Sequence, residues 1–285
     1  MNARTTLRER LEQGPPVLAP VCLDPLAARL IEQLGFGAGY LSGGALGFSL
    51  AVSEALLTVT EIATATRQIT QRSALPLIVD IGVGFGDAVH VSRTIREAEA
   101  AGAAAVELED QVAPKRAHHH RGVEHLVPLE EMVGKIEEAV RAREDDGMLL
   151  IARTGGVRNE SLDAAIERGR AYAEAGADLV MLTPASEDDL RRAAAEIPRP
   201  LALMSIAGRW DMALLAEIGV PLLIDPFTGQ VEMYRALRDA YTHIREQGAP
   251  ATPSEELMAA YRELQGVAGM DELYAIEERT TERPA

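Results

Sequence analysis

The chain has 285 residues, of which 47% are hydrophobic, and a formal net charge of -16. Its length is close to the roughly 250 residues of one barrel-sized α/β domain. The negative charge disfavours nucleic acids and anionic membrane surfaces as partners, because like charges repel. Cys22 is the single cysteine, so we expect no disulfide framework and no cysteine-based zinc site. The N-terminus has no apolar signal-like segment and no apolar run could span a bilayer, so we expect a cytoplasmic protein.

One unit recurs along the chain: a short apolar run, a polar or glycine-rich corner, and an amphipathic helix that ends at a glycine. Gly102, Gly176 and Gly219 each follow such a helix, as expected for a residue that takes the left-handed conformation without a steric penalty. The apolar runs are short and show no alternation, which favours strands buried on both faces. We predict strands at 17–22, 38–42, 76–80, 104–108, 148–152, 178–182, 200–204 and 221–225. We predict helices between them at 25–34, 59–71, 88–101, 129–144, 161–175, 187–196, 210–218 and 230–247.

This alternation predicts an α/β fold, a single (β/α)8 TIM-type barrel within one domain, 1–285. A doubly wound open sheet is the alternative. The glycine-rich segment 82–86 lacks the acidic residue of a dinucleotide site, so we expect no such site. Two more helical patterns, at 253–264 and 271–282, form a C-terminal helical extension at about 250–285. Their apolar faces need cover, which favours packing on a neighbouring subunit.

Polar side chains cluster where the predicted strands end, which is where a barrel carries its chemistry. Asp80, Glu107 and Glu109 supply carboxylates, and Arg153 supplies one guanidinium. Carboxylate oxygens suit Mg²⁺ or Mn²⁺, and an arginine can bind a substrate carboxylate through two hydrogen bonds. The alternative is that several of these residues are helix caps or salt bridges within the barrel.

Five motifs occur in order, and together they resemble the isocitrate lyase/phosphoenolpyruvate mutase superfamily, in particular its methylisocitrate lyase-like branch. The motifs are Tyr40-Leu41-Ser42-Gly43-Gly44, the segment 79–86 around Asp80, Glu109-Asp110-Gln111 with Pro114-Lys115-Arg116, Ile151-Ala152-Arg153-Thr154, and the segment 165–178. The resemblance implies a barrel whose terminal helices are exchanged between subunits of a homodimer or homotetramer. It also implies a small 2-oxo acid or its enolate bound with Mg²⁺ (or Mn²⁺).

The resemblance assigns a role to each matching position. The substrate would be bound by Tyr40, Ser42, Gly43, Gly44 and Arg153. Asp80 and Glu109 would hold the metal, directly or through water. Arg153 and Lys115 would act on the substrate, and Lys115 would begin a mobile gate segment that closes over the site.

The chain departs from the family pattern at several of these positions. An Asp-x-Asp motif is reduced to Asp80-Ile81-Gly82, and an Arg-Thr-Asp motif ends in Gly155. A further family aspartate falls near Ser53, with Glu54 adjacent. These losses should weaken Mg²⁺ binding, which depends on oxygen ligands.

The gate differs too. Its usual cysteine is replaced by Ala117, and three histidines follow. His119 aligns with the gate histidine and could replace the thiol as a general acid. The alternative is a solvated histidine turn.

The sequence therefore predicts an enzyme, a lyase that cleaves a C–C bond of a small 2-hydroxy or 2-oxo carboxylic acid through a metal-stabilised enolate. Its active site would be atypical, without the gate cysteine and part of the metal shell. One alternative is an oxaloacetate-type decarboxylase or a C–P bond mutase or hydrolase. Another is a non-catalytic relative that binds a metabolite.

Overall fold

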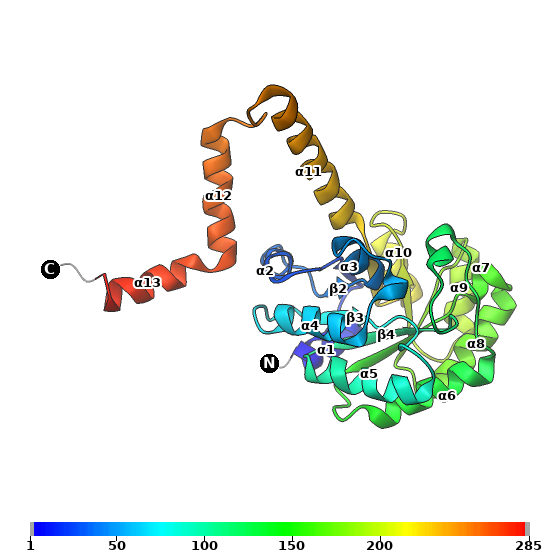
Figure 1. The fold of residues 1–285 in the computed structure, drawn as a ribbon. Helices are drawn as coiled ribbons and strands as arrows, with labels where there is room; N and C mark the ends of the chain where they lie inside the picture. The colour runs from blue at the N-terminus through cyan, green and yellow to red at the C-terminus, as the bar shows by residue number, and fades with distance from the viewer. Residues whose placement is uncertain (1–2, 283–285) are drawn as a thin grey trace. The chain divides into compact units, whose positions relative to one another are not determined.

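A computed structural model describes residues 3–282 of the chain. The chain divides into two compact units, one up to Thr228 and one from Gly229 onwards. The first unit contains eight strands. Figure 1 shows helices around the strands. Every residue that the sequence assigns to the active site lies in this first unit.

The eight strands are parallel, and each coincides with a predicted strand to within about two residues at either end. They are β1 (Val17–Pro20), β2 (Gly39–Leu41), β3 (Leu77–Asp80), β4 (Ala105–Glu109), β5 (Leu149–Arg153), β6 (Leu179–Leu182), β7 (Leu201–Met204) and β8 (Leu222–Asp225). Strand β1 pairs with β8, and the remaining strands follow in order back to β2. A parallel bridge between Val21 and Tyr40 joins β1 to β2. This bridge closes the ring, so the predicted (β/α)8 barrel is confirmed and the open sheet is excluded.

The helices between the strands also match the prediction. They are α2 (Pro25–Gln33), α4 (Val59–Thr70), α5 (Ala88–Ala100), α6 (Leu129–Ala142), α8 (Leu162–Glu174), α9 (Glu187–Glu196) and α10 (Met212–Ile218). Asp24 and Asp87 cap the first turns of α2 and α5 by accepting backbone hydrogen bonds. Five further elements were not predicted: α1 (Ala3–Gln13), α3 (Gly43–Ser49), η1 (Glu54–Leu56), η2 (Ala117–Arg121) and α7 (Gly156–Asn159).

Side chains alternate between the barrel interior and the helix layer along each strand. In β4, Val106 and Leu108 belong to the outer core beneath the helices, whereas Ala105 belongs to the core inside the barrel. Glu107 and Glu109 occupy alternate positions of the strand from Ala105, so their side chains also point into the barrel. In β5, Ile151 packs in the inner core. Arg153 follows two residues later, so its side chain points to the same side. Strand pleating therefore brings charged side chains into the carboxyl end of the barrel.

The opposite end of the barrel is apolar. Leu7 of α1 is fully buried in the inner core, which also contains the first residues of several strands, such as Val17 and Leu149. Helix α1 thus covers the amino end of the barrel, and the interior is accessible for chemistry only at the carboxyl end.

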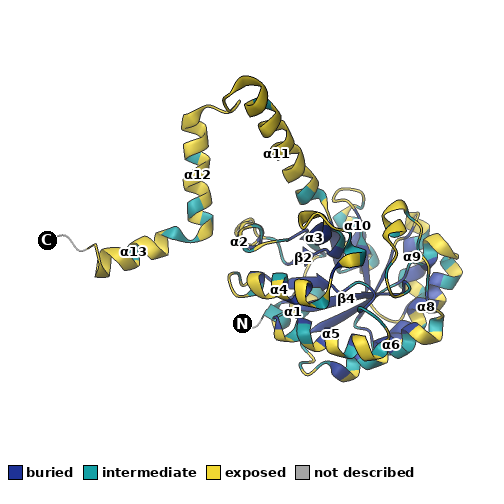
Figure 2. Cartoon of the chain, viewed as in Figure 1, coloured by how far each residue is buried: buried dark blue, intermediate teal, exposed yellow. Residues whose placement is uncertain are grey.

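The second unit consists of α11 (Thr228–Gln247), α12 (Ser254–Ala268) and α13 (Met270–Thr280). None of these three helices has a buried residue, as Figure 2 shows by their largely exposed surface. Helix α11, which the sequence placed with the barrel, therefore falls in the same unit as the extension predicted from about residue 250. Within residues 3–282, no helix is both long and apolar enough to cross a membrane.

Candidate active site

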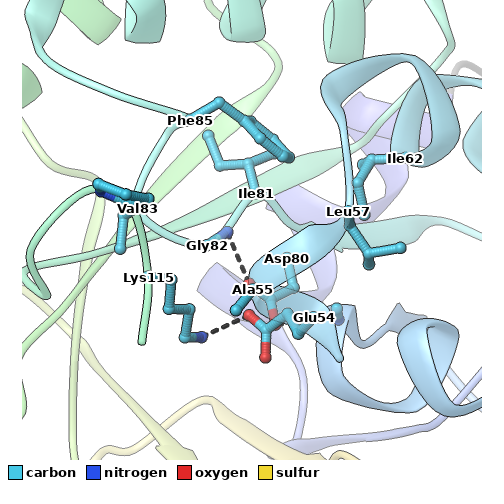
Figure 3. A pocket seen from close by; sticks show the side chains of 12 residues that line it. Glu54, Ala55, Leu57, Ile62, Asp80, Ile81, Gly82, Val83, Phe85 and Lys115 are labelled. Carbon is cyan, nitrogen blue, oxygen red and sulfur yellow. Dashed lines mark hydrogen bonds and ion pairs between the residues drawn. The ribbon is translucent and has the colours of Figure 1, made fainter. Parts of the chain in front are cut away.

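A cavity of about 190 Å³ opens at the carboxyl end of β3, between η1 and the segment that follows β4 (Figure 3). Its polar side chains are Glu54, Asp80 and Lys115, and the other side chains along it are mainly apolar. The lining residues are Gly43, Glu54, Ala55, Leu57, Ile62, Asp80, Ile81, Gly82, Val83, Phe85, Pro114 and Lys115. Of the residues predicted for the site, Gly43, Asp80 and Lys115 line this cavity.

Asp80, one of the two predicted metal ligands, is buried among other charged side chains. It pairs in register with Glu107 of β4, and its own carboxylate accepts hydrogen bonds from the Gly43 amide at 3.0 Å and the Gly82 amide at 2.8 Å. Burial, together with the charges of Glu107 and Glu54, raises the pKa of Asp80 well above its usual range. The site thus concentrates more negative charge near Asp80 than neighbouring side chains neutralise.

Arg153 lies above two glutamates of the adjacent strand. Glu109 and Arg153 are register partners, and the Arg153 guanidinium lies 3.0 Å from Glu107 Oε1 and 3.7 Å from Glu109 Oε2. Burial opposes the charged form, but both carboxylates raise the pKa of Arg153. Tyr40 is fully buried and its hydroxyl donates to Glu107. Tyr40, predicted to bind substrate, thus contacts the carboxylate beneath Arg153.

Lys115 links the gate segment to the mouth of the barrel. Its ammonium donates to Glu54 and lies 2.5 Å from Glu109 Oε1. Glu109 Oε1 has no other polar partner among the described residues, so the Lys115 ammonium is the group that compensates its buried charge. Burial alone would raise the pKa of Glu109, but Lys115 and Arg153 reverse this and lower it. Lys115 and Glu109 are therefore a buried, oppositely charged pair.

The gate residue predicted as an acid, His119, is held at both ring nitrogens. Its Nδ1 lies 2.6 Å from the Arg116 carbonyl oxygen, and its Nε2 lies 3.1 Å from Glu54 Oε2. The His120 ring packs on the His119 ring with their centroids 3.9 Å apart. Only a tenth of the His119 side chain is exposed, so the predicted alternative of a freely solvated histidine turn does not describe this residue.

Glu54 is the residue of this site that the sequence did not assign. It begins η1, after the N-cap Ser53, and its side chain is only 10% exposed. Burial would raise its pKa, but the hydrogen bond with His119 and the charge of Lys115 lower it to about 2. The single indication in the sequence was its place next to Ser53, the position where the family pattern carries an aspartate.

Three further predicted residues form the turn into α3. Ser42 is the N-cap of α3, and its hydroxyl accepts a hydrogen bond from the Ala45 amide at 3.3 Å. Gly43 holds Asp80 through its amide. A side chain on Gly44 would lie 3.5 Å from Glu54 Oε2, so Gly44 faces the gate contacts.

Asp110, at the centre of the Glu109-Asp110-Gln111 motif, does not share this environment. It is fully buried and accepts hydrogen bonds from Tyr172 Oη at 2.8 Å and from the Gly155 amide at 3.0 Å, with Arg168 at 3.4 Å. These partners come from α8 and from the end of β5. Asp110 therefore connects the strand ends to the helix layer. This role agrees with the alternative prediction that some strand-end residues form salt bridges within the barrel.

The position of the second missing carboxylate cannot supply a metal ligand. A side chain on Gly155 would begin 2.7 Å from Glu124 Oε2, which already accepts a hydrogen bond from Asn159. Within residues 3–282, no three His, Cys, Asp or Glu side chains are grouped as ligands of one ion. Mg²⁺ is commonly bound by one or two carboxylates and completed by water and substrate oxygens. Asp80 and Glu109, with the excess negative charge near Asp80, fit that mode of binding.

Comparisons with known proteins show which family the chain resembles. The phosphoenolpyruvate phosphomutase family model matches residues 7–245. The chain is 36% identical over 284 residues to 2,3-dimethylmalate lyase of Eubacterium barkeri, covering 97% of this chain and 98% of that protein. It is 40% identical over 250 residues to 2-methylisocitrate lyase of Aeropyrum pernix, covering 85% and 80% of the two chains.

A solved structure of phosphonopyruvate hydrolase in complex with oxalate and Mg²⁺ superposes with a TM-score of 0.86 at 31% identity, covering 99% of this chain and 100% of that one. The similarity to named lyases confirms the prediction of an enzyme of the carbon–carbon lyase type. Because the family match and both relatives extend over most of the chain, the protein belongs to the phosphoenolpyruvate phosphomutase family of the PEP mutase/isocitrate lyase superfamily.

Proposed function

We propose that the protein cleaves a C–C bond in a small 2-hydroxy or 2-oxo carboxylic acid, with a divalent cation, Mg²⁺ or Mn²⁺, as cofactor. The observation that carries this proposal is the grouping of Asp80, Glu109 and Arg153 at the mouth of the barrel beneath a gate that carries Lys115 and His119. The carboxylate oxygens suit a divalent cation, and the guanidinium suits a substrate carboxylate. The two gate residues are placed to stabilise the enolate and to protonate it.

Binding follows from the charges of these groups. Arg153 would bind a substrate carboxylate through its guanidinium, and the Ser42 hydroxyl with the Gly44 amide would hold the oxygen at C2. Gly43 keeps Asp80 in place through its amide, and Tyr40 supports Glu107 beneath Arg153. Asp80 and Glu109 would hold the cation, which when bound neutralises negative charge developing on substrate oxygens.

The chain's own residues would then move a proton. In a 2-hydroxy acid that carries a second carboxylate on C3, the C2–C3 bond breaks, the hydroxyl proton passes to solvent water, and C2 becomes an oxo carbon. The bonding electrons pass to C3 and its carboxylate as an enolate, and C3 then needs a proton. His119 would donate it from Nε2, the ring nitrogen turned towards Glu54, while the Lys115 ammonium offsets the negative charge.

The apolar side of the cavity narrows the substrate class. Leu57, Ile62, Ile81 and Phe85 lie on one side of the cavity and the charged residues on the other (Figure 3). A volume of about 190 Å³ slightly exceeds the ~150 Å³ of an engineered cavity that binds benzene. We therefore expect an acid with a short alkyl branch, in keeping with the methyl-substituted substrates named for two relatives.

The second unit supports assembly into a homodimer or homotetramer. Helices α11, α12 and α13 expose large apolar side chains, among them Tyr241, Leu257, Tyr261 and Ile276. Exposed apolar surface of this extent needs cover, and exchange of these helices between subunits would provide it. The molar mass in solution tests this, and a monomer would contradict it.

A substrate panel tests the proposed function. Purified protein with Mg²⁺ would be incubated with 2,3-dimethylmalate, 2-methylisocitrate, malate, oxaloacetate and phosphonopyruvate, and the products would be identified by NMR. We expect cleavage of a branched 2-hydroxy acid into a 2-oxo acid and a second carboxylic acid. Substituting His119→Asn should lower kcat by about 10²–10⁴-fold with little change in KM, as for loss of a general acid.

The other outcomes have defined meanings. Release of CO₂ from oxaloacetate, or of phosphate from phosphonopyruvate, without C–C cleavage of a hydroxy acid would replace this proposal with the decarboxylase or C–P alternative. Binding of oxo acids without turnover of any substrate would favour a non-catalytic relative.

A further inference from the structure

Glu54 occupies a gap between two glycines at the mouth of the barrel. Side chains on Gly43 and Gly82 would begin 3.1 Å and 3.6 Å, respectively, from Glu54 Oε1. The family pattern carries a carboxylate at position 82, and here that carboxylate is lost while Glu54 extends towards the same space from η1. Figure 3 shows its carboxylate beside Asp80, facing Lys115.

Both carboxylate oxygens of Glu54 are used, and both contacts lead to the gate. Oε1 accepts a hydrogen bond from Lys115, and Oε2 lies 3.1 Å from His119 Nε2. Lys115 also contacts Glu109, so Glu54 connects the two gate residues to the strand ends. All of these side chains are at most a tenth exposed, so water does little to weaken the contacts.

The two contacts of His119 require a particular form of the ring. A backbone carbonyl faces Nδ1 and an ionised carboxylate faces Nε2, and both groups can only accept hydrogen bonds. The form that donates to both is the imidazolium, which carries a proton on each nitrogen. The His120 ring packs on His119, and Lys115 shares the carboxylate of Glu54 with it. Positive charge on either neighbour would oppose a positive His119 ring, whereas the negative charge of Glu54 favours it.

We propose that Glu54 is a positioning residue that keeps His119 as an imidazolium and ties the gate to the barrel mouth. This charge-assisted pair takes the place of the gate cysteine as a source of the proton. The use of that proton in catalysis rests on the proposed function, but the state of His119 and the closure of the gate do not.

Two measurements without substrate test the inference. The first is the ¹⁵N NMR spectrum of histidine-labelled protein near neutral pH, with the His119 signal assigned by its loss in His119→Asn. We expect both ring nitrogens of His119 to be protonated in the unaltered protein, and one to lose its proton in Glu54→Gln. A neutral His119 ring in the unaltered protein would overturn the inference, even if Glu54→Gln failed to fold.

The second measurement is limited trypsin cleavage after Lys115, Arg116 and Arg121, all within the gate. Glu54→Gln should speed this cleavage about tenfold, since a hydrogen bond to a charged group shifts an equilibrium by such a factor or more. Glu167→Gln, at an exposed position of α8, is the matched control and should leave the rate unchanged. Equal cleavage of Glu54→Gln and the unaltered protein would contradict the inference.

The two proposals can fail separately. If the spectrum and the cleavage behave as expected while no acid of the panel is consumed, Glu54 keeps its role and the proposed reaction is wrong. If a branched acid is cleaved at the same rate by Glu54→Gln and the unaltered protein, the reaction stands and His119 is not the source of its proton.

Discussion

The carboxylate of Glu54 lies 3.6 Å from where a side chain on Gly82 would begin. The two positions are distant in sequence and belong to different βα units. Glu54 supplies a carboxylate to the space next to position 82, where the glycine has no side chain. A second carboxylate there would meet the first at close range and be repelled by it. A carboxylate restored at position 82 and the carboxylate of Glu54 are therefore linked through electrostatic repulsion.

This link predicts that restoring the family carboxylate will impair the protein. Gly82→Asp should lower kcat/KM on the substrate found in the panel by about tenfold or more, since like charges in a buried site disfavour each other by about a kcal/mol or more. The positive φ of +53° at this position strains any side chain, although aspartate adopts it more readily than most residues, so Gly82→Asn is the control for backbone strain. Combining Gly82→Asp with Glu54→Gln should recover part of the loss. Full activity of the single variant would refute the link.

Removing either predicted metal ligand should weaken cation binding. Asp80→Asn and Glu109→Gln each delete one of the two carboxylates that would hold the ion. The Kd for Mn²⁺ should therefore rise at least about tenfold, since this is roughly the loss of affinity when a residue that only hydrogen-bonds to a metal ligand is removed. Isothermal titration calorimetry measures it directly, with Glu167→Gln as the control. Chelation by EDTA should also abolish turnover. Activity that persists in EDTA would show that no cation is needed.

The stability of the protein should depend on Glu54 in acid. Its pKa is lowered to about 2 from an ordinary value of 4.5. A lowered pKa in the folded state contributes stability that is present above the ordinary value and lost as the pH falls towards the folded value. The free energy of unfolding should thus lose on the order of 3 kcal/mol from this group between about pH 4.5 and 2.

Urea unfolding across this pH range checks the expectation. The difference in unfolding free energy between the unaltered protein and Glu54→Gln should shrink as the solution becomes more acidic. A difference that stays constant with pH would mean that Glu54 has no lowered pKa in the folded protein.

Asp110 should matter for stability and not for chemistry. Tyr172→Phe removes the 2.8 Å hydrogen bond from the tyrosine hydroxyl to Asp110, and loss of a bond to a buried charged group costs about 1–3 kcal/mol. Calorimetry should show a Tm lowered by several degrees, with activity per folded molecule unchanged. Glu167→Gln, at an exposed position of α8, is the control. A large fall in kcat at unchanged Tm would place Asp110 in the catalytic machinery.

The sequence by itself determined the barrel and the strand-end part of the site. Each strand is a short apolar run that ends at a polar corner, so the eight strands could be located without long-range information. Asp80, Glu109 and Arg153 then followed, because parallel strands in a closed ring bring their carboxyl ends together whatever the helices do. Local patterning suffices wherever a residue's position depends only on its strand.

Only the tertiary structure decided how the remaining residues act. Glu54 begins η1, which has only three residues and therefore shows no periodicity. Its partners Lys115 and His119 are more than 60 residues away, so no local pattern could join them. Asp110 and Glu109 are neighbours in sequence, yet strand pleating turns one to the helix layer and the other to the barrel mouth. The family motif therefore contains one residue for stability and one for the site, a division that depends on which side of the barrel wall each side chain occupies.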